Sequence, residues 1–599
     1  MRAGSKEQHA AWVQSRISKI PDAWQPRYID HYNAKKKDEV ADSVANAWLR
    51  EETADFENIK LPLTATDDQL CDIANQCAAH CMDLYRVSTD LATLRANQED
   101  YVERWCIKPP PPYDRISRTG TDDLPAVKRM TDALWWRRGL RVVHARQLER
   151  HAINLGYVHK RASSYCSEET LLRRTQQRQR NTQALEATLV TNEFGHTFSL
   201  AELSSRTVAN PEIRRGELMT RIAGFEATAK RLGHVAEFVT VTCPSRFHPR
   251  LAASGEENPH HDGSTPKHAA HYLARKWSQL RAKFQRMGLR VYGFRVAEPH
   301  HDACPHWHMI LFFNPVLSEG VASIARFRAM TRKYFLTDHK HEPGAKARRV
   351  TFVRIDMEKG SAAGYIAKYV AKNIDGFRML DGEDGHSALA NAARVEAWAS
   401  TWGIRQFQQI GGPCVGLWRE LRRLKPTPVE HHEPGYWIEA VRVAADSGDW
   451  DQYVTTMGGP TALAIHRPVA LQYGPEQTTD KETGEITQSV GRYGEPIERA
   501  VTGIWEVVTG KILKVLRYVW EFPARLLGRL LTPWTGVNNC TQPHDTTIDA
   551  SGKNRATIEH RSGCPPDKSD RIQSPGHIFD GVPVLHEGSG HIAETLASI

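Results

Sequence analysis

At 599 residues the chain is too long to fold around one hydrophobic core, so several modules are expected. Its composition, 40% hydrophobic and 25% charged residues, excludes a wholly disordered chain and a membrane protein built mainly of apolar spans. The 79 lysines and arginines exceed the 70 acidic residues, and the formal charge of +9 permits a polyanionic partner without identifying one.

The first half of the chain reads as helical. The N-terminus has no apolar secretion signal, which predicts a protein of the bacterial cytoplasm. Residues 1–108 carry apolar and charged residues at helical spacing and stop at the proline run 109–112, which predicts an N-terminal helical module and a stiff linker. Residues 124–231 form a second predicted helical region, rich in Arg and Gln.

The pattern changes to mixed strands and helices over residues 232–425. Strands are predicted at 237–243, 289–297, 306–313 and 350–355, and helices at 266–287, 322–335 and 361–373. Strands that return between helices over this length indicate an α+β domain built on one sheet with helices on a face.

The C-terminal part carries less pattern. Residues 426–535 are expected to form an extension whose main element is a basic amphipathic helix at 501–531, since its lysines and arginines recur mostly three or four apart. Those charges argue against a transmembrane span. Residues 536–599, rich in Gly, Ser, Pro, Asp and His, are expected to be a disordered tail.

The predicted strand 306–313 opens with two histidines, His306 and His308, separated by Trp307. Side chains alternate across a strand, so both imidazoles should project from one face and can grip a metal ion together. A second His-x-His pair, His339 and His341, lies in a polar segment flanked by Gly and Pro and has no such rigid support. The first pair is therefore the stronger candidate.

A carboxylate is expected to complete the metal site. Glu298 ends the preceding predicted strand and is the preferred third ligand, with Asp302 and His301 as competitors. Two imidazoles and a carboxylate oxygen, with positions left open for phosphate, suit Mg²⁺ or Mn²⁺.

The predicted helix 361–373 carries two tyrosines and two lysines on one face. Tyr365, Lys368, Tyr369 and Lys372 are three or four residues apart. Aromatic stripes at this spacing usually pack in a core, but the lysines on the same stripe argue against burial. A phenol beside ammonium groups can attack phosphorus, because the cations lower its pKa and offset the charge of the transition state.

Taken together, these motifs resemble a known family. The segments TVTCPSRFHP, PHWHMILFF, YIAKYVAK and WGIRQFQQIGGP are similar, in this order, to the bacteriophage replication gene A protein family of the HUH endonuclease superfamily, over roughly residues 125–425. The resemblance implies a ferredoxin-like α+β nuclease core, metal ligands His306 and His308, and nucleophiles Tyr365 and Tyr369. Trp307 is larger than the aliphatic residue usual between the two histidines.

The same resemblance implies a function. Such a protein cuts single-stranded origin DNA at a specific site, keeps the 5′ end as a phosphotyrosine, and primes rolling-circle replication of a phage genome from the free 3′ hydroxyl. The second tyrosine later releases the circle. No GxxxxGK[ST] nucleotide-binding loop occurs in the sequence, so unwinding is expected to fall to a host helicase.

A basic segment is expected to hold the DNA. Between Gly263 and Ala297 there is no acidic residue, and aromatic residues that could stack on unpaired bases, Tyr272, Trp277 and Phe284, are interleaved with the cations. The predicted DNA-binding residues are Lys267, Arg275, Lys276, Arg281, Lys283, Arg286 and Arg290, with Arg295 at the end of the segment.

Three alternatives stay open on the sequence. A plasmid replication initiator, a conjugative relaxase or a transposase would use the same chemistry, although two tyrosines four apart favour replication over a single-tyrosine transposase. A non-catalytic DNA-binding protein would hold a structural zinc on His306, His308 and Glu298. A metallohydrolase would attack with metal-bound water. Only the tyrosine mechanism leaves protein covalently attached to a 5′ end.

Overall fold

The computed structural model describes residues 3–522, except 37–40, 59–60, 112–122, 253, 318–321, 377–386, 480–483, 516–517 and 519. The predicted tail at 536–599 lies outside the described residues. Within the described part of the chain, no helix is both long and apolar enough to cross a membrane.

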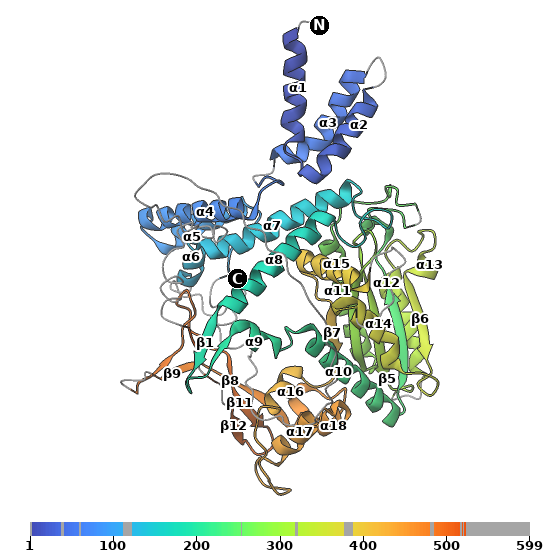
Figure 1. The fold of residues 1–599 in the computed structure, drawn as a ribbon. Helices are drawn as coiled ribbons and strands as arrows, with labels where there is room; N and C mark the ends of the chain where they lie inside the picture. The colour runs from blue at the N-terminus through green and yellow to red at the C-terminus, as the bar shows by residue number, and fades with distance from the viewer. Residues whose placement is uncertain are drawn as a thin grey trace, which may run out of the picture.

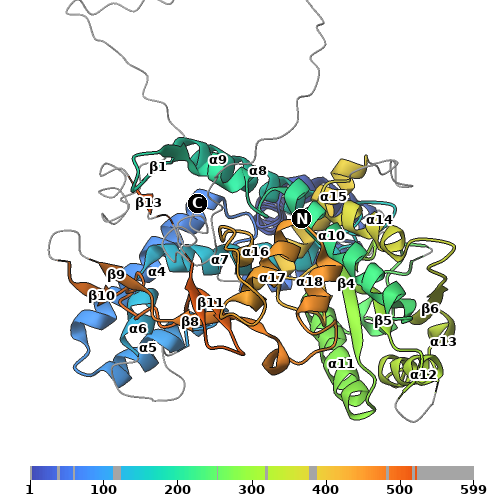
Figure 2. The same cartoon turned by 90° about the horizontal axis from the view of Figure 1, so that it is seen from below.

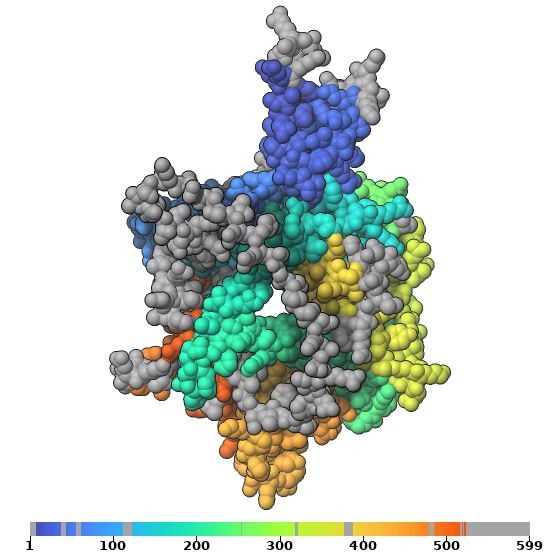
Figure 3. All heavy atoms as spheres, in the orientation of Figure 1, coloured from blue at the N-terminus to red at the C-terminus, as the bar shows by residue number. Residues whose placement is uncertain are grey.

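The N-terminal part is helical. It comprises α1 (Ala3–Ile17), α2 (Gln25–Lys35), α3 (Ala41–Asn58), α4 (Asp67–Val87) and α5 (Leu91–Glu103), with a short 3₁₀ turn at Asp22–Trp24. The first three helices stand out from the body of the molecule (Figure 3). They are anchored at their base, where Trp24 stacks on Tyr157 at 5.1 Å and packs in one buried cluster with Leu148 and Trp398.

The second predicted helical region is helical with one interruption. Its helices are α6 (Leu124–Met130), α7 (Ala133–Asn154), α8 (Glu168–Ala187), α9 (Leu200–Ser205) and α10 (Pro211–Arg231). Between α8 and α9 lies a hairpin of β1 (Leu189–Asn192) and β2 (Thr197–Ser199), which also pairs with β13 (Trp520–Glu521) near the far end of the described chain. The sequence pattern did not predict this hairpin.

A five-stranded antiparallel sheet lies to one side of the molecule, at the right in Figure 1. Its strands are β3 (Val235–Val241), β4 (Val291–Pro299), β5 (Pro305–Phe313), β6 (Val350–Ile355) and β7 (Phe407–Ile410), in the order β6-β3-β5-β4-β7. The first four were predicted to within two residues at each end, because each is a run of β-branched and aromatic residues. The short edge strand β7 was not predicted as a strand.

Helices cover both faces of this sheet, whereas the sequence led us to expect helices on one face. On one face lie α10 and α14 (Ala362–Ile374); on the other lie α11 (Pro266–Arg286) and α12 (Ser323–Leu336) (Figure 2). The physical reason is visible in β5, where residues of both parities are apolar: Ile310 packs toward α10 and α14, and Met309 toward α11. A strand buried on both faces reads as a continuous apolar run.

Three further helices lie within the described part of residues 232–425. They are α13 (Ala345–Arg348), α15 (Ala388–Trp402) and α16 (Val415–Leu421). An ion pair joins helix α12 to the sheet. Glu237 of β3 is fully buried, and Arg328 of α12 donates to both of its carboxylate oxygens at 2.9 Å.

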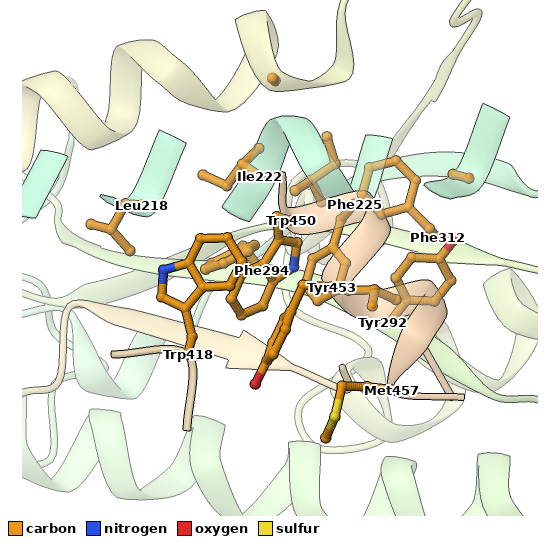
Figure 4. Close-up of a cluster of buried hydrophobic side chains, with 14 of the residues drawn as sticks. Leu218, Ile222, Phe225, Tyr292, Phe294, Phe312, Trp418, Trp450, Tyr453 and Met457 are labelled. Carbon is orange, nitrogen blue, oxygen red and sulfur yellow. The ribbon is translucent and has the colours of Figure 1, made fainter. Parts of the chain in front are cut away.

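The C-terminal extension shares the core of the sheet. It contains α17 (Tyr436–Asp446), α18 (Trp450–Thr456), β8 (Val469–Gly474), β9 (Gln477–Thr479), β10 (Ile486–Gln488), β11 (Ala500–Glu506) and β12 (Ile512–Lys514), with a 3₁₀ turn at Ala464–His466. Figure 4 shows Trp450 and Tyr453 of α18 and Trp418 of α16 against Phe225 of α10 and Phe294 of β4. The extension and the sheet domain are therefore packed around one hydrophobic cluster.

The predicted basic helix at 501–531 is wrong in its described part. Residues 500–514 form the hairpin of β11 and β12 instead, and residues 523–531 lie outside the described residues. The hairpin turns at Gly510, whose φ of 77° a helix cannot accommodate. The regular spacing of lysines and arginines was misleading because Val501 and Ile504 are β-branched and pair with β8, with Thr502 at a bulge between them.

One glycine of the sheet provides a stability prediction. Gly293 in β4 has a φ of 145°, and a Cβ there would collide with the carbonyl oxygen of Ile310. We expect Gly293→Ala to lower the free energy of unfolding by about 1–3 kcal/mol, from backbone strain and displacement of β5. Urea denaturation followed by circular dichroism measures this loss. The matched control is Gly216→Ala on the exposed side of α10, where the new Cβ would have no neighbour within 4 Å among the described residues apart from its own helix backbone and chain neighbours, and a gain of roughly 1 kcal/mol is expected.

Candidate active site

Three side chains meet at one end of the sheet, where β4 and β5 pair. The antiparallel register places Glu298 directly opposite His306 and Val296 opposite His308. The Nε2 atoms of the two histidines are 2.9 Å apart, and His308 Nε2 lies 3.9 Å from Glu298 Oε2. One ligand atom from each of the three residues lies within 4.8 Å of the others. This is the donor set that the sequence pattern proposed.

The electrostatics of the two histidines suit a metal ligand. Burial, together with the nearby Lys372 ammonium, lowers the pKa of His308 to about 3, and burial and the neighbouring imidazoles hold the pKa of His306 well below its ordinary value. Both rings are therefore neutral at physiological pH, as metal ligation requires. His308 Nδ1 lies 3.0 Å from the Thr240 hydroxyl, which orients the ring so that Nε2 faces the cluster.

The spacing of the two histidine nitrogens is that of neighbouring ligands on an octahedral cation. Neighbouring ligands of an octahedral ion at about 2.1 Å are about 3 Å apart, close to the observed 2.9 Å between the histidine nitrogens. His306 Nδ1 is buried and has no hydrogen-bond partner among the described residues. Between two neutral imidazoles at this distance, one nitrogen can donate a hydrogen bond and the other can accept it. A bound cation would instead accept a lone pair from each nitrogen.

Helix α14 is fastened to this cluster through Glu298. The Glu298 carboxylate accepts a hydrogen bond from Asn373 Nδ2 and lies 3.4 Å from Lys372 Nζ, both from the last turn of α14. The first turn is fixed as well: Ser361 caps the helix, and Glu226 of α10 accepts hydrogen bonds at 2.8 Å from the Ser361 hydroxyl and the Ala363 amide. Both ends of the helix are therefore held against the sheet domain.

The two tyrosines of α14 lie beside the histidine pair. The ring of Tyr369 stacks on His308 with centroids 4.0 Å apart, and both Tyr369 and Tyr365 contact Phe238 of β3, at 5.6 and 5.9 Å. Tyr365 is 47% exposed, whereas Ile366 and Val370 on the opposite side of the helix are buried. The apolar side of α14 forms the core, and the tyrosine side faces solvent next to the cluster.

The two lysines of this face differ in environment. Lys368 is exposed, and its Nζ lies over the Tyr369 ring, 4.8 Å from the centroid. Burial alone would lower the pKa of Lys372, but the Glu298 carboxylate raises it above its ordinary value, so the ammonium stays charged. One cation therefore accompanies the phenol, and the other neutralises the buried carboxylate.

The competing ligands are engaged elsewhere. The Asp302 carboxylate lies 2.9 Å from His248 Nδ1, and His301 Nδ1 lies 3.0 Å from the Ser164 hydroxyl. The structure thus brings Glu298, rather than Asp302 or His301, to the histidine pair. The other His-x-His motif, His339 and His341, lies in an exposed turn.

Two histidines that sequence reasoning missed extend the site. The His300 ring stacks on His306 at 4.1 Å and meets the His248 ring edge-on at 5.1 Å. Burial opposes charging of His248, but Asp302 outweighs it and raises the pKa of this imidazole. His248 lies in the segment TVTCPSRFHP, whose similarity to the family was the only available signal for it.

A third tyrosine reaches the site from the second helical region. Tyr165 is buried and has a φ of 75°, the left-handed conformation that non-glycine residues rarely adopt. Its ring stacks on His301 at 5.3 Å, and Lys372 Nζ lies 5.2 Å from its centroid. No spacing pattern could have pointed to Tyr165, because its partners lie far away in the sequence.

The predicted DNA-binding segment forms α11, the turn after it and the first part of β4, which contains Arg295. Arg275, Arg281, Arg286 and Arg290 are exposed, whereas Lys276 is paired with Asp338 at 2.7 Å. The other two predicted residues, Lys267 and Lys283, are partly buried.

The aromatic residues of that segment are not available to DNA. Tyr272, Trp277 and Phe284 are all buried in the cluster between α11 and the sheet. The expectation that unpaired bases stack on them was therefore wrong, since an amphipathic helix turns its large apolar side chains inward.

Comparison with known proteins places the chain in a family. The model of the bacteriophage replication gene A protein (GPA) family matches residues 63–377, more than half of the chain. The replication gene A protein of Escherichia phage 186 is 37% identical over 72% of this chain and 62% of its own length, so the chain spans less than two thirds of that relative. A probable replication endonuclease from a prophage-like region of Salmonella paratyphi A is 31% identical over 74% of this chain and 54% of its own length.

A further relative matches over a larger share. The probable replication protein of Pseudoalteromonas phage PM2 is 32% identical over 91% of this chain and 87% of its own length. No solved structure matches. With the family model covering more than half of the chain and this relative covering nearly all of it, the chain belongs to the bacteriophage replication gene A protein family.

Proposed function

We propose that the chain is a site-specific single-strand DNA endonuclease and strand transferase that initiates rolling-circle replication of a phage genome through a 5′-phosphotyrosine intermediate. The observation that carries the proposal is the stacking of Tyr369 on His308, 4.0 Å between ring centroids, with the exposed Tyr365 one turn away on the same helix. A phosphate bound at the histidine cluster would be within reach of a phenol from α14. The relatives named as replication proteins and endonucleases support this class of activity.

The sheet supplies the frame for the reaction. We take the five-stranded sheet with its His306 and His308 pair to be the HUH nuclease core, of ferredoxin-like type. His306, His308 and Glu298 would hold Mg²⁺ or Mn²⁺, which when bound polarises the scissile phosphate and offsets its charge. Thr240 keeps the His308 ring in position for this role, at 3.0 Å from Nδ1.

The chain's own groups carry the bond changes. A tyrosine phenolate attacks phosphorus, the P–O3′ bond breaks, and the 3′ oxygen takes up a proton to become a free hydroxyl. The 5′ phosphate stays on the tyrosine as an ester, so the energy of the phosphodiester is stored. Lys368, whose ammonium lies over the Tyr369 ring, would offset the negative charge that develops on the phosphate oxygens.

The second tyrosine allows the reaction to be reversed on a new strand. After one round of synthesis, the unused phenol attacks the regenerated junction, and the released 3′ hydroxyl attacks the first ester to close a circle. Both phenols contact Phe238, so either can approach one phosphate without movement of the sheet. We further propose single-stranded origin DNA, a host helicase and the host replication machinery as partners, and the bacterial cytoplasm as the place of action.

A direct experiment tests the proposal. The chain is incubated with Mn²⁺ and single-stranded DNA cloned from its own replicon, and the products are separated on a denaturing gel that resolves free from protein-linked DNA. A protein-linked 5′ end that maps to Tyr365 or Tyr369 by mass spectrometry supports the tyrosine mechanism. Cleavage without a protein-linked end would identify a metallohydrolase, and binding without cleavage would identify a zinc-stabilised DNA-binding protein.

The metal site generates one prediction. We expect His306→Ala and His308→Ala each to lose several kcal/mol of transition-state stabilisation, roughly a thousandfold in nicking rate, while DNA binding persists. Treatment of the wild-type protein with a chelator should lower the nicking rate to the same extent, and added Mn²⁺ should restore the nicking rate. The control is His339→Ala in the exposed His-x-His turn, which should nick as the wild type does. Full activity after chelation would rule out the metal role.

The two tyrosines of α14 generate a second prediction about the reaction. Each single variant, Tyr365→Phe or Tyr369→Phe, should still form some covalent adduct but fail to release a closed circle. The double variant should form no adduct, because Phe keeps the ring contacts with Phe238 and His308 and removes only the hydroxyl. Denaturing gels and circle-release assays measure the two steps.

A control variant and a contradicting outcome complete the test of the tyrosines. Tyr334→Phe, on the opposite face of the sheet, should behave as the wild type does. A folded double variant that forms the adduct at the wild-type rate would return both tyrosines to a packing role.

A further inference from the structure

A cleft of about 1370 Å³ opens along the outer edge of β7. Its walls come from α10, the C-terminal half of α11, β7, α16 and the segment that leads into β8. Sites for drug-sized molecules occupy roughly 300–1,000 Å³, so this cleft has room for something larger. It combines parts of the sheet domain with parts of the C-terminal extension.

The lining of the cleft is strongly basic. Among the described residues it carries seven arginines and a single acidic side chain, Glu217, an excess of six positive charges. Glu217 is shared by Arg419 at 2.8 Å and Arg221 at 3.1 Å, so it does not neutralise the rest. Arg281, Arg290 and Arg405 are exposed, and the field of this surface favours a polyanion.

The cleft begins beside the metal-ligating cluster. The carbonyl of Gln406 accepts a hydrogen bond at 2.7 Å from the amide of Ala297, the neighbour of Glu298. Arg405 lies next to this contact, and from there the cleft follows β7 to Ile410, which pairs with Gly293 at the opposite end of β4. A polymer that passes over the histidine pair can therefore continue into the cleft.

Aromatic side chains on the walls favour unpaired bases. Tyr473 of β8 is 43% exposed, and the guanidinium of Arg499 lies over its ring at 4.6 Å from the centroid. Phe407, at the start of β7, is partly exposed. The exposed Tyr473 ring and the partly exposed Phe407 ring, which also packs against the core, lie among cations. Single-strand binding grooves combine such stacking surfaces with phosphate contacts, whereas the bases of a duplex are already stacked.

We propose that this arginine-lined cleft binds the single-stranded DNA that flanks the scissile phosphate. The proposal rests on the proposed nicking function and adds to it a path for the substrate. Of the basic segment 263–297 it selects Arg281 and Arg290, and it joins them to Arg405 from a different part of the chain. It also gives the C-terminal extension a role, since β8 supplies one wall of the path.

The test compares charge removal inside and outside the cleft. Arg281→Gln with Arg405→Gln forms the cleft variant, and Arg326→Gln with Lys333→Gln on exposed positions of α12 forms the control. The probe is a fluorescein-labelled oligodeoxythymidine of about 30 nucleotides, followed by fluorescence anisotropy. If two phosphate contacts are lost, the slope of log affinity against log salt should fall by about 1.4, because each contact to a single strand contributes about 0.7. The control should keep the wild-type slope.

Further arms identify what would overturn the proposal. An unchanged slope in the cleft variant, or an equal loss in Arg275→Gln with Arg286→Gln on the part of α11 outside the cleft, would refute the cleft as the DNA path. A loss confined to a duplex probe of the same length would assign the cleft to double-stranded DNA instead. Circular dichroism and thermal melting of each variant confirm that the fold is intact.

The outcome is separable from that of the nicking function. Oligodeoxythymidine binding needs no cleavage, so it reports on the cleft even if no covalent adduct forms with Mn²⁺ and the replicon's DNA. Conversely, if the wild type forms the adduct and the cleft variant binds oligodeoxythymidine as the wild type does, only the proposal that the cleft binds DNA is refuted. Phe407→Ala and Tyr473→Ala provide a second measurement: each should weaken binding about 5- to 150-fold if a base stacks there, with the salt slope retained.

Discussion

Glu298 carries a carboxylate that is almost fully buried, and a buried charge is stable only when neighbouring groups neutralise it and hydrogen-bond to it. Lys372 and Asn373 meet both needs, and both belong to the helix that carries the two tyrosines. The Asn373 amide is also contacted by Gln406, next to the edge strand. One carboxylate thus fixes the distance between the histidine pair and the phenols, and ties the helix to the strand along which the basic cleft runs.

Local pattern was enough to predict the elements that carry the site. His306 and His308 share a face because strand side chains alternate, and Tyr365 and Tyr369 share a face because helical residues four apart do. Glu298 was found because it ends the strand that precedes the histidines. These relations depend on residues close in sequence, so they needed no knowledge of the tertiary fold. The family resemblance added roles to these residues, and the family itself is confirmed by the comparisons.

What the sequence could not provide are relations between distant segments. The edge strand β7 is too short to show a period, and its pairing with β4 joins residues more than one hundred positions apart. The positions of Tyr165 and of the cleft arginines could not be predicted for the same reason, because the groups around them come from distant regions of the chain. The helix expected at 501–531 failed for a different reason: the regular spacing of lysines and arginines indicates a polar helix face, although Gly510 and the β-branched residues before it, Val501 and Ile504, favour a hairpin.

The left-handed backbone of Tyr165 has a consequence for where this protein can be divided. The turn that carries it is locked to the turn after β4, through Ser164 and the amide of Tyr165 itself, which donates to the His301 carbonyl. On its other side, Arg394 of α15 donates to Ser163 and Glu168. A chain that began at the first strand of the sheet would therefore lack one side of the cluster of side chains around Glu298 and Lys372. In evolutionary terms the second helical region is an integral part of the sheet domain, and the two are expected to be inherited, lost or exchanged as one unit.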